Sequence, residues 1–411
     1  MDMQDFKKLT EVYGSPLFIV DESKIMHQFN QIRTEFSKLY PNTEIAYAYK
    51  ANYLLGICNL INELGGLAEV VSGFEYMIAK SIGVEGEKII VNGPYKPKDE
   101  LIIMIQDGCI INVDNIEELE LINDIASDEG MVVEIGLRIN ATIGKIPWSK
   151  FGFDVEGNDA FDAVCKLKDQ FGNIDLKGIH IHIGTNIIYP GLYRQAVTIV
   201  LGFIKKIRDE LGIDIDYIDM GGGYPVKDAC PANINFKDWS VPDIKYYAKA
   251  ICEPLNDFYK DDDNRPLLIL EPGRYLVDES MSLVTSVTSV KSIHCIRSIF
   301  VDAGVNILPS AYYRKHKIEA YTDCKEKELT DIYGALCMNV DLLEAGVVLP
   351  KVKIGDILNI SNAGAYEQSH SMQFSRLRPA VVSIKDDDEI VMIRRKERVE
   401  DIIRLERSVY E

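Results

Sequence analysis

Reactive side chains in this 411-residue sequence stand where apolar, strand-like runs end. They are Lys50 after EIAYAY, His182 in GIHIHIG, the triplet Gly221, Gly222 and Gly223 after YIDM, and Glu271 after LLIL. A lysine amine forms a Schiff base with an aldehyde, and a carboxylate can keep a pyridine ring nitrogen protonated. Glycine-rich turns present backbone N–H groups that can hold a phosphate. Together these groups indicate pyridoxal phosphate as a cofactor.

Each of these residues also has a structural explanation when it is taken alone. A lysine at the end of a strand is often a surface residue whose amine reaches solvent. Three glycines are commonly a flexible turn, and a buried histidine such as His180, two positions before His182, is commonly a hydrogen-bonded core residue. The chemical interpretation depends on their positions, in chain order, at the ends of the first, sixth, seventh and eighth of the predicted strands given below.

The elements that would position these residues are short apolar runs alternating with longer segments of helical periodicity. The predicted strands are 44–49, 68–71, 88–92, 110–113, 134–140, 178–183, 217–220 and 267–271. The predicted helices are 54–64, 74–83, 97–107, 115–128, 158–170, 191–211 and 242–259. Eight strands with interposed helices are typical of a parallel (β/α)8 barrel, whose active site forms at the carboxyl ends of the strands. An open doubly wound sheet would show the same alternation.

The pattern changes after about residue 275, where strand-like runs such as SLVTSVTSVKSIH and GDILNISNAGAY follow one another with few helical intervals. We therefore expect an α/β fold with a barrel over residues 22–275 and an all-β domain over residues 276–411. The N-terminal segment 1–21 contains the strand-like SPLFIVD and is expected to join the β domain.

Composition limits the classes of partner. The net charge of -19 argues against nucleic acid or an anionic membrane surface, because both attract basic patches. The eight cysteines form no CxxC pair, so neither a zinc site nor a disulfide framework is indicated. The sequence shows no apolar run of the ~20 residues that a membrane span needs and no signal-peptide pattern at its start. We expect a cytoplasmic protein, and the predicted chemistry needs no metal.

Beyond these residues, the sequence resembles the pyridoxal-phosphate decarboxylases with an alanine-racemase-like barrel (fold type III), the group of the diaminopimelate, ornithine and arginine decarboxylases. The motifs that carry the resemblance are YGSPLFIVD, YAYKAN, EVVSGFE, SKFGF, GIHIHIGTN, MGGGYP, EPGRYLV, VDAG and NAGAY. They follow the expected order along nearly the whole chain and are most similar to the diaminopimelate branch. The resemblance implies a pyridoxal-phosphate-binding barrel followed by a C-terminal β domain.

The resemblance also implies roles that spacing alone leaves open. Lys50 would carry the cofactor, His182 would stack on its ring, and Glu271 would pair with the ring nitrogen. Arg138 would support the ring side of the site, and Tyr366 would reach the cofactor from the C-terminal domain. The residues implied around the phosphate are Thr185, Gly221, Gly222, Gly223, Gly273 and Arg274.

The segment YGALCMNVD, residues 333–341, resembles the family's catalytic cysteine motif. Cys337 would be the general acid that protonates the α-carbon after CO2 leaves, with Asp341 as its motif partner. In the family these residues enter the active site of the neighbouring subunit, so the resemblance implies a homodimer with two shared sites. The implied substrate contacts are Arg274, Tyr313, Met338, Asp341 and Tyr366.

Three departures from the diaminopimelate branch fall where its substrate is held. Its cysteine is followed by a glutamate that pairs with the distal ammonium, and this chain has Met338 there. The segment 305–313, VNILPSAYY, keeps Tyr313 but lacks an arginine, and the loop 141–148, ATIGKIPW, is short. A lost charge-assisted contact costs roughly 1.5–3 kcal/mol, so two losses would weaken a doubly zwitterionic substrate by orders of magnitude.

We therefore predict a decarboxylase that removes the α-carboxylate of an amino acid or an amino-acid conjugate in antibiotic or siderophore biosynthesis. Such a substrate would be carrier-linked, a siderophore precursor, or an aminocarboxypropyl group on a peptide. Diaminopimelate decarboxylation to L-lysine is the alternative. A racemase on the same barrel would need a second base opposite the lysine, and a non-catalytic relative would be expected to lack Lys50 or Cys337.

Overall fold

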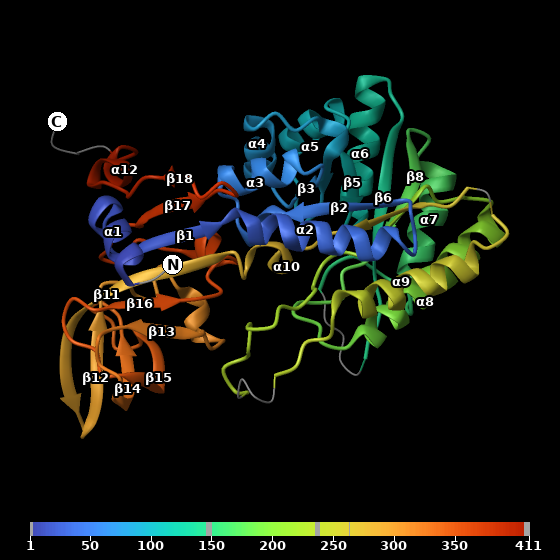
Figure 1. Ribbon diagram of the computed structural model, residues 1–411. Coiled ribbons are helices and arrows are strands. Elements are labelled where there is room, and N and C mark those ends of the chain that lie inside the picture. The colour runs from blue at the N-terminus through green and yellow to red at the C-terminus, as the bar shows by residue number, and fades with distance from the viewer. Residues whose placement is uncertain (1–2, 145–149, 235–238, 263, 407–411) are drawn as a thin grey trace. The chain divides into compact units, whose positions relative to one another are not determined.

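The computed structural model describes residues 3–144, 150–234, 239–262 and 264–406, and these divide into two compact units (Figure 1). The barrel unit contains residues 26–225 and 241–276, and the β unit contains residues 1–25, 226–240 and 277–411. The predicted barrel range includes residues 226–240, and two described residues of this stretch, Cys230 and Ala232, pair through their backbone with a segment of the β unit. Ala232 donates its N–H to the carbonyl of Tyr313, and Lys315 donates to that of Cys230.

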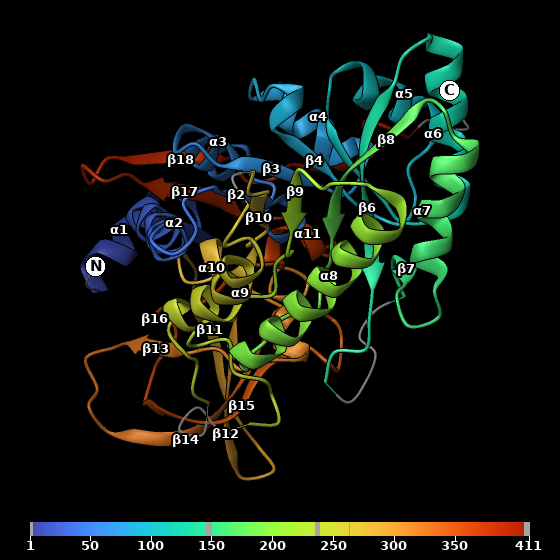
Figure 2. The same cartoon turned by 90° about the vertical axis from the view of Figure 1, so that its right-hand side faces the viewer.

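Eight parallel strands close into a barrel in the barrel unit (Figure 2), which confirms the predicted barrel. The strands, in barrel order, are β2 (Thr43–Ala48), β3 (Leu67–Val70), β4 (Ile89–Val91), β5 (Ile110–Val113), β6 (Val133–Asn140), β8 (Ile174–His180), β9 (Tyr217–Asp219) and β10 (Leu267–Leu270). The pairing of β10 with β2 and of β5 with β6 leaves none of these eight as an edge. A two-residue strand, β7 (Phe153–Asp154), pairs outside the ring with the end of β6.

Helices precede, connect and follow the barrel strands, and three of them begin at side-chain caps that the sequence supplies. They are α2 (Glu22–Ser37), α3 (Leu55–Glu63), α4 (Gly73–Ser81), α5 (Lys98–Gln106), α6 (Ile116–Glu129), α7 (Asp159–Gln170), α8 (Pro190–Leu211), α9 (Ile244–Phe258) and α10 (Arg274–Val277). The side chains of Ser72, Asn115 and Asp243 accept backbone N–H groups at the starts of α4, α6 and α9. Helices α8 and α9 lie side by side (Figure 2). Within the described part of the chain, no helix is long and apolar enough to cross a membrane.

The interior of the barrel changes from apolar to polar toward the carboxyl ends of its strands. One cluster of buried residues from four strands contains Ala46, Ile90, Tyr217 and Ile269. Further along the strands or just beyond them come buried polar residues, listed here: Glu69, Asn92, Asn112, Asp219 and Glu271. Buried polar groups need hydrogen-bond partners, and these residues find them in one another.

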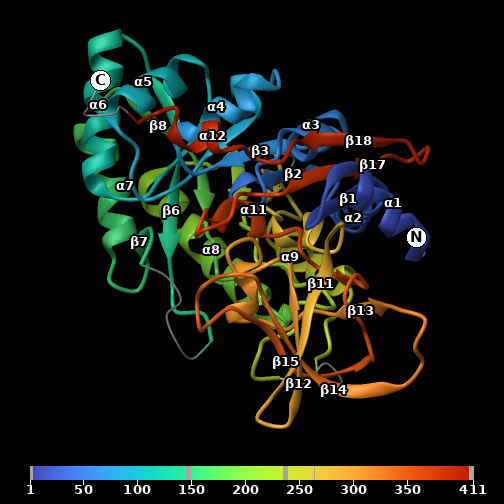
Figure 3. The ribbon, with the colours of Figure 1, turned by 90° about the vertical axis from the view of Figure 1, so that its left-hand side faces the viewer.

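The β unit contains a mostly antiparallel sheet (Figure 3). Its strands are β1 (Leu17–Asp21), β11 (Met281–Ile293), β12 (Ile296–Val301), β13 (Ile318–Tyr321), β14 (Lys327–Tyr333), β15 (Leu342–Pro350), β16 (Ile357–Ile360), β17 (Ala380–Ile384) and β18 (Ile390–Arg394). The N-terminal strand β1 lies between β11, to which it is antiparallel, and β17, to which it is parallel. The short helices of this unit are α1 (Met3–Tyr13), α11 (Glu367–His370) and α12 (Val399–Ile403).

A hydrophobic core of the β unit forms where α1 packs on the strands β1, β11, β16 and β17. Phe6 and Leu9 of α1 contact buried side chains of β1, β11, β16 and β17. Because Leu17 and Ile19 alternate along β1, both face the same side of the sheet and meet the helix. Burial of this face explains why the N-terminal strand belongs to the C-terminal sheet.

Candidate active site

Lys50 lies in a one-turn 3-10 helix, η1 (Tyr49–Ala51), directly after barrel strand β2. Its amine forms an ion pair with Glu69 of the neighbouring strand β3, and the Glu69 side chain is fully buried. Gly273 lies against this turn, since a Cβ there would be 2.9 Å from the Cβ of Ala51 and 3.2 Å from that of Ala48. The glycine of EPGR therefore allows the loop after β10 to approach the lysine turn.

A single side-chain amide joins the partner of Lys50 to Glu271. Asn92, which follows β4, donates from Nδ2 to Glu69 Oε1 at 2.9 Å and to Glu271 Oε1 at 2.5 Å. All three side chains are buried. Lys50, Glu69, Asn92 and Glu271 thus form one continuous polar chain across the barrel mouth.

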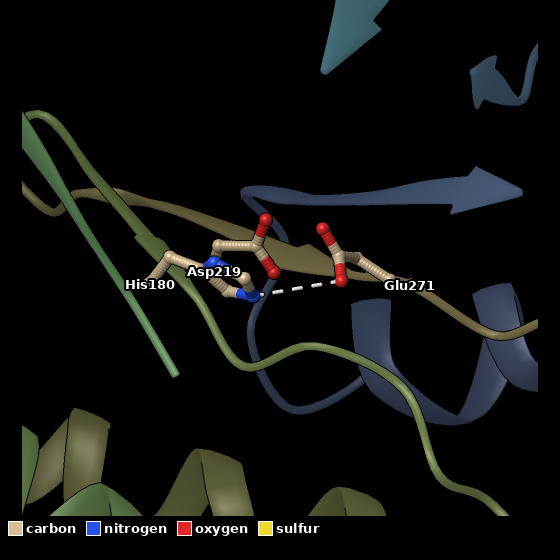
Figure 4. Close-up of side chains that lie close together, drawn as sticks. All are labelled: His180, Asp219 and Glu271. Atoms are coloured by element: carbon tan, nitrogen blue, oxygen red, sulfur yellow. Dashed lines mark ion pairs between the residues drawn. The ribbon is translucent and has the colours of Figure 1, made fainter. Parts of the chain in front are cut away.

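Glu271 also belongs to a buried cluster with His180 and Asp219 (Figure 4). His180 Nε2 lies 3.6 Å from Glu271 Oε2. One ring nitrogen of His180 and one carboxylate oxygen from each of Asp219 and Glu271 all lie within 4.8 Å of one another. His180 ends β8, Asp219 ends β9 and Glu271 follows β10, so three adjacent strands deliver the cluster. Asp219 is further held by the N–H of Gly221, which donates to its Oδ1 at 2.9 Å.

The two carboxyl groups of this cluster differ in charge. Burial and the neighbouring Glu271 raise the pKa of Asp219 well above its usual range. Burial also opposes ionisation of Glu271, but His180 and Lys50 outweigh it and hold the pKa of Glu271 below its usual range. The pair therefore favours one shared proton over two negative charges, with Asp219 the more readily protonated carboxyl and Glu271 the more readily ionised one.

His182 is a neutral imidazole with a defined tautomer. Burial and the Lys50 amine lower the pKa of His182 to about 3. The N–H of Gly222 donates to His182 Nδ1 at 3.0 Å, so the proton of the neutral ring is on Nε2. An uncharged, oriented ring at the barrel mouth is suited to stacking on a planar cofactor.

The glycine triplet is required by close packing as much as by any ligand. A Cβ at Gly222 would lie 2.2 Å from the carbonyl oxygen of Glu271, and Gly221 and Gly223 have φ angles of 63° and 97°. The N–H groups of Gly221 and Gly222 donate to Asp219 and His182 inside the protein. Two of the three predicted phosphate donors are thus already engaged, which leaves Gly223 as the candidate amide of the triplet.

The remaining predicted residues of the barrel unit differ in exposure. Arg138 on β6 is buried, with its guanidinium 4.6 Å from the centre of the Phe151 ring and 3.8 Å from Asp114 Oδ1. Thr185 is exposed in the loop after β8, and Arg274 is the half-buried first residue of α10. The predicted short loop 141–148 lies partly outside the described residues, which end at residue 144 and resume at 150.

In the β unit, the loop between β14 and β15 presents the cysteine motif. The Cys337 thiol is exposed, and Met338 is partly exposed beside it. Asp341 is buried and accepts the N–H of Leu336 at 2.7 Å and the N–H of Val305 at 2.8 Å, one on each carboxylate oxygen. Its contacts are those of a residue that holds this loop in place.

The two predicted tyrosines of the β unit flank a buried ionic cluster. Tyr313 is 48% exposed and precedes Arg314, while Tyr366 precedes Glu367 and has a φ angle of 74°. Arg314 donates to Glu367 at 3.2 Å and to Asp278 at 2.8 Å. The left-handed conformation at Tyr366 is unfavourable for a residue with a side chain and is maintained by the structure around it.

Sequence reasoning assigned no role to Glu69, Asn92 or Asp219, and it treated His180 as a core residue. Their only signal is position, since each is a polar residue within a predicted strand, namely 68–71, 88–92, 178–183 or 217–220. Polar residues that end buried strands need partners, but the sequence does not show which strands become neighbours. The pairing among them became visible only in the closed barrel.

The donor set of the barrel mouth fits pyridoxal phosphate. Lys50 offers an amine for the aldehyde, Glu271 offers a buried anion for the ring nitrogen, and His182 offers a neutral ring. All three come from the carboxyl ends of parallel strands, where barrel enzymes place their active sites.

Comparison with known proteins identifies both parts of the chain. Residues 22–278 match the family described as pyridoxal-dependent decarboxylase, pyridoxal binding domain, and residues 274–364 match its C-terminal sheet domain. The diaminopimelate decarboxylase of Methanocaldococcus jannaschii is 33% identical, covering 98% of this chain and 93% of that protein. The diaminopimelate decarboxylase of Aquifex aeolicus is 30% identical, covering 97% of this chain and 93% of that protein.

Solved structures agree with the sequence comparison. The M. jannaschii diaminopimelate decarboxylase in complex with L-lysine has a TM-score of 0.90 at 33% identity, covering 98% of this chain and 94% of that one. The Helicobacter pylori enzyme in complex with L-lysine has a TM-score of 0.87 at 28% identity, covering 98% and 99%. These matches confirm the predicted family: the chain belongs to the pyridoxal-dependent decarboxylases, enzymes whose cofactor is pyridoxal phosphate.

Proposed function

We propose that the barrel mouth decarboxylates an α-amino acid, with Lys50 holding the cofactor, Glu271 facing its ring nitrogen and His182 stacking on its ring. When bound, pyridoxal phosphate supplies an electron sink for the electron pair left as CO2 departs. The observation that carries the proposal is the polar chain from Lys50 through Glu69 and Asn92 to Glu271, which places an amine and a buried anion in one mouth. Cys337 then supplies the proton to the α-carbon.

Diaminopimelate is the first substrate to test. Relatives of this name are about 30% identical to the chain and match nearly all of it. The solved relatives bound to L-lysine, the product of that reaction, have the same fold. These similarities favour diaminopimelate over the conjugated substrates that the sequence departures suggested.

A second candidate, an amino acid with a different distal end, is favoured by one observation in the chain itself. Met338 follows Cys337 where a carboxylate would pair with a distal ammonium, and a thioether cannot form that charge-assisted hydrogen bond. The segment 305–313 also contains no guanidinium. A conjugated amino acid without a free distal zwitterion has no need of either group.

The experiment is mass spectrometry of the cofactor-loaded enzyme with meso-diaminopimelate, following lysine formation and CO2 loss. Lysine formed at the rate of an efficient decarboxylase supports the first candidate, and an intact cofactor spectrum without product supports the second. Lys50→Ala is expected to abolish turnover and change the visible absorbance of the bound cofactor. Lys80→Ala, which removes an ion-paired lysine of the same unit, serves as the control.

We propose further that the active protein is a homodimer whose sites combine Lys50 of one subunit with Cys337 of the other. The exposure of the Cys337 thiol agrees with a residue that acts outside its own loop. Mixing and refolding the inactive variants Lys50→Ala and Cys337→Ser would then restore about a quarter of the activity, because hybrid dimers contain one intact site. If both residues act within one subunit, the mixture stays inactive.

A further inference from the structure

The geometry points to Asn92 as a positioning residue that holds Glu69 and Glu271 through one amide nitrogen. The inference rests on the proposed roles of Lys50 and Glu271, and it assigns a function to a residue that touches neither the reacting carbon nor the lysine. Asn92 Nδ2 has two protons, and each carboxylate accepts one of them, at 2.9 Å for Glu69 and 2.5 Å for Glu271.

The orientation of this amide is fixed by two further residues. Tyr217 Oη donates to Asn112 Oδ1 at 2.9 Å, and Asn112 Nδ2 in turn donates to Asn92 Oδ1 at 2.9 Å. Burial raises the pKa of Tyr217 well above its usual range, so its hydroxyl keeps the proton and starts the sequence of donors. Asn112 therefore points its nitrogen at the amide oxygen of Asn92, and Asn92 points its own nitrogen at the two carboxylates. A flipped Asn92 would face them with its oxygen.

Asn92 donates hydrogen bonds to two buried carboxyl groups that lie close together. Burial raises the pKa of Glu69, and although the Lys50 amine opposes this, the charge on Glu271 adds to it. Two buried carboxylates disfavour each other's ionised form, and a donor to both offsets part of that cost. One shared amide donates to both carboxylates and keeps their separation fixed, which positions Lys50 relative to the carboxylate that faces the ring nitrogen.

Asparagine fits this position better than its near relatives. Aspartate at residue 92 has the same size but would bring a third carboxyl group to Glu69 and Glu271. Alanine leaves both carboxylates without this donor, and a hydrogen bond to a charged group is worth about 10- to 100-fold in an equilibrium constant. The alternative explanation, that Asn92 only stabilises the fold, predicts equal cofactor affinity once the variant is folded.

The test measures the dissociation constant of pyridoxal phosphate by equilibrium dialysis, together with urea unfolding of the cofactor-free protein. Asn92→Ala is expected to weaken cofactor binding about 10- to 100-fold, and Asn92→Asp more than that. The control Asn256→Ala removes a barrel asparagine with two hydrogen bonds, to Leu39 and Arg265, and is expected to bind the cofactor as wild type does. Wild-type affinity in Asn92→Ala would overturn the inference.

Double substitutions separate positioning from a general structural effect. If Asn92 acts through its two partners, the loss caused by Asn92→Ala shrinks to about threefold or less in Glu69→Gln and in Glu271→Gln. An unchanged loss in both backgrounds would show a structural role and overturn the inference. If Asn92→Ala does not fold, Tyr217→Phe tests the same chain of hydrogen bonds from its other end. The expected loss of cofactor affinity is then about 3- to 10-fold.

These outcomes are distinguishable from failure of the proposed function. If Lys50→Ala leaves the cofactor absorbance unchanged, the role of Lys50 is wrong whatever Asn92 does. If Lys50→Ala changes it and Asn92→Ala binds the cofactor normally, only the role of Asn92 is wrong.

Discussion

Arg314 Nη2 donates to Glu367 Oε1 at 3.2 Å, and both side chains are buried in the β unit. Burial alone would lower the pKa of Arg314, but the carboxylates of Asp278 and Glu367 raise it, so the guanidinium stays charged. Arg314 directly follows Tyr313, and Glu367 directly follows Tyr366. One ionic contact therefore ties together the two backbone segments that present the predicted tyrosines.

Arg314→Met is expected to destabilise the protein by about 3–5 kcal/mol, because it leaves two carboxylates buried without their cation. Arg314→Lys is expected to lose less, since one ammonium keeps the charge but lacks the planar fork that reaches several acceptors. Urea unfolding measures the effect. The control Arg395→Met breaks the ion pair of an exposed arginine with the partly exposed Asp401 in the same unit and is expected to change stability less than Arg314→Met does. Equal stability of the Arg314→Met and wild-type proteins would contradict the assigned contact.

Asp341 provides a second test in the β unit, because its two oxygens hold Leu336 and Val305. Asp341→Asn keeps one acceptor and turns the other into a donor, which conflicts with a backbone N–H. We expect a loss of about 1–3 kcal/mol in stability and a fall in turnover through displacement of the Cys337 loop. Cofactor affinity, measured by dialysis, is expected to stay at the wild-type value. A variant with full turnover would show that the loop does not depend on Asp341.

The sequence predicted the barrel because its eight strands are short apolar runs, and each of the first seven is followed by a helix with recognisable periodicity. It predicted Lys50, His182 and Glu271 because reactive residues at strand ends are few and their chemistry is distinctive. It could not predict the polar chain through Asn92, since that chain depends on β4 lying between β3 and β5 in a closed ring that also brings β10 beside β2. Nor could the sequence indicate the backbone pairing of Pro231, inside the predicted barrel range, with Arg314, because the two residues are far apart in sequence.

Glu75 predicts a specific pH dependence of stability. It lies buried in the first turn of α4, and burial together with the nearby Glu69 raises its pKa to about 7. A carboxyl whose folded pKa is raised stabilises the fold only while it is protonated, so its contribution falls as pH rises from its unfolded pKa of about 4.5 toward 7. Glu75→Gln removes this pH-dependent loss of stability, and the glutamine can still accept the N–H of Val71.

We therefore expect Glu75→Gln to gain stability relative to wild type with rising pH, by about 2 kcal/mol between about pH 5 and about pH 8. Urea unfolding at the two pH values measures the difference. Glu117→Gln changes an exposed carboxylate at the equivalent turn of α6 and is expected to show no such trend. A constant difference between Glu75→Gln and wild type across this range would contradict a raised pKa.

Met338 allows the substrate question to be tested by adding a charge. Met338→Glu places a carboxylate beside Cys337, where the diaminopimelate branch has one, and a charge-assisted hydrogen bond to a distal ammonium is worth roughly 1.5–3 kcal/mol. We expect kcat/KM for meso-diaminopimelate to rise by about tenfold or more, mainly through a lower KM, because the new contact binds a part of the substrate that does not react. The control Asn339→Glu adds the same charge to an exposed neighbour. An equal rise in both variants would indicate general attraction of a cationic substrate, and no rise in Met338→Glu would show that residue 338 does not face the distal end.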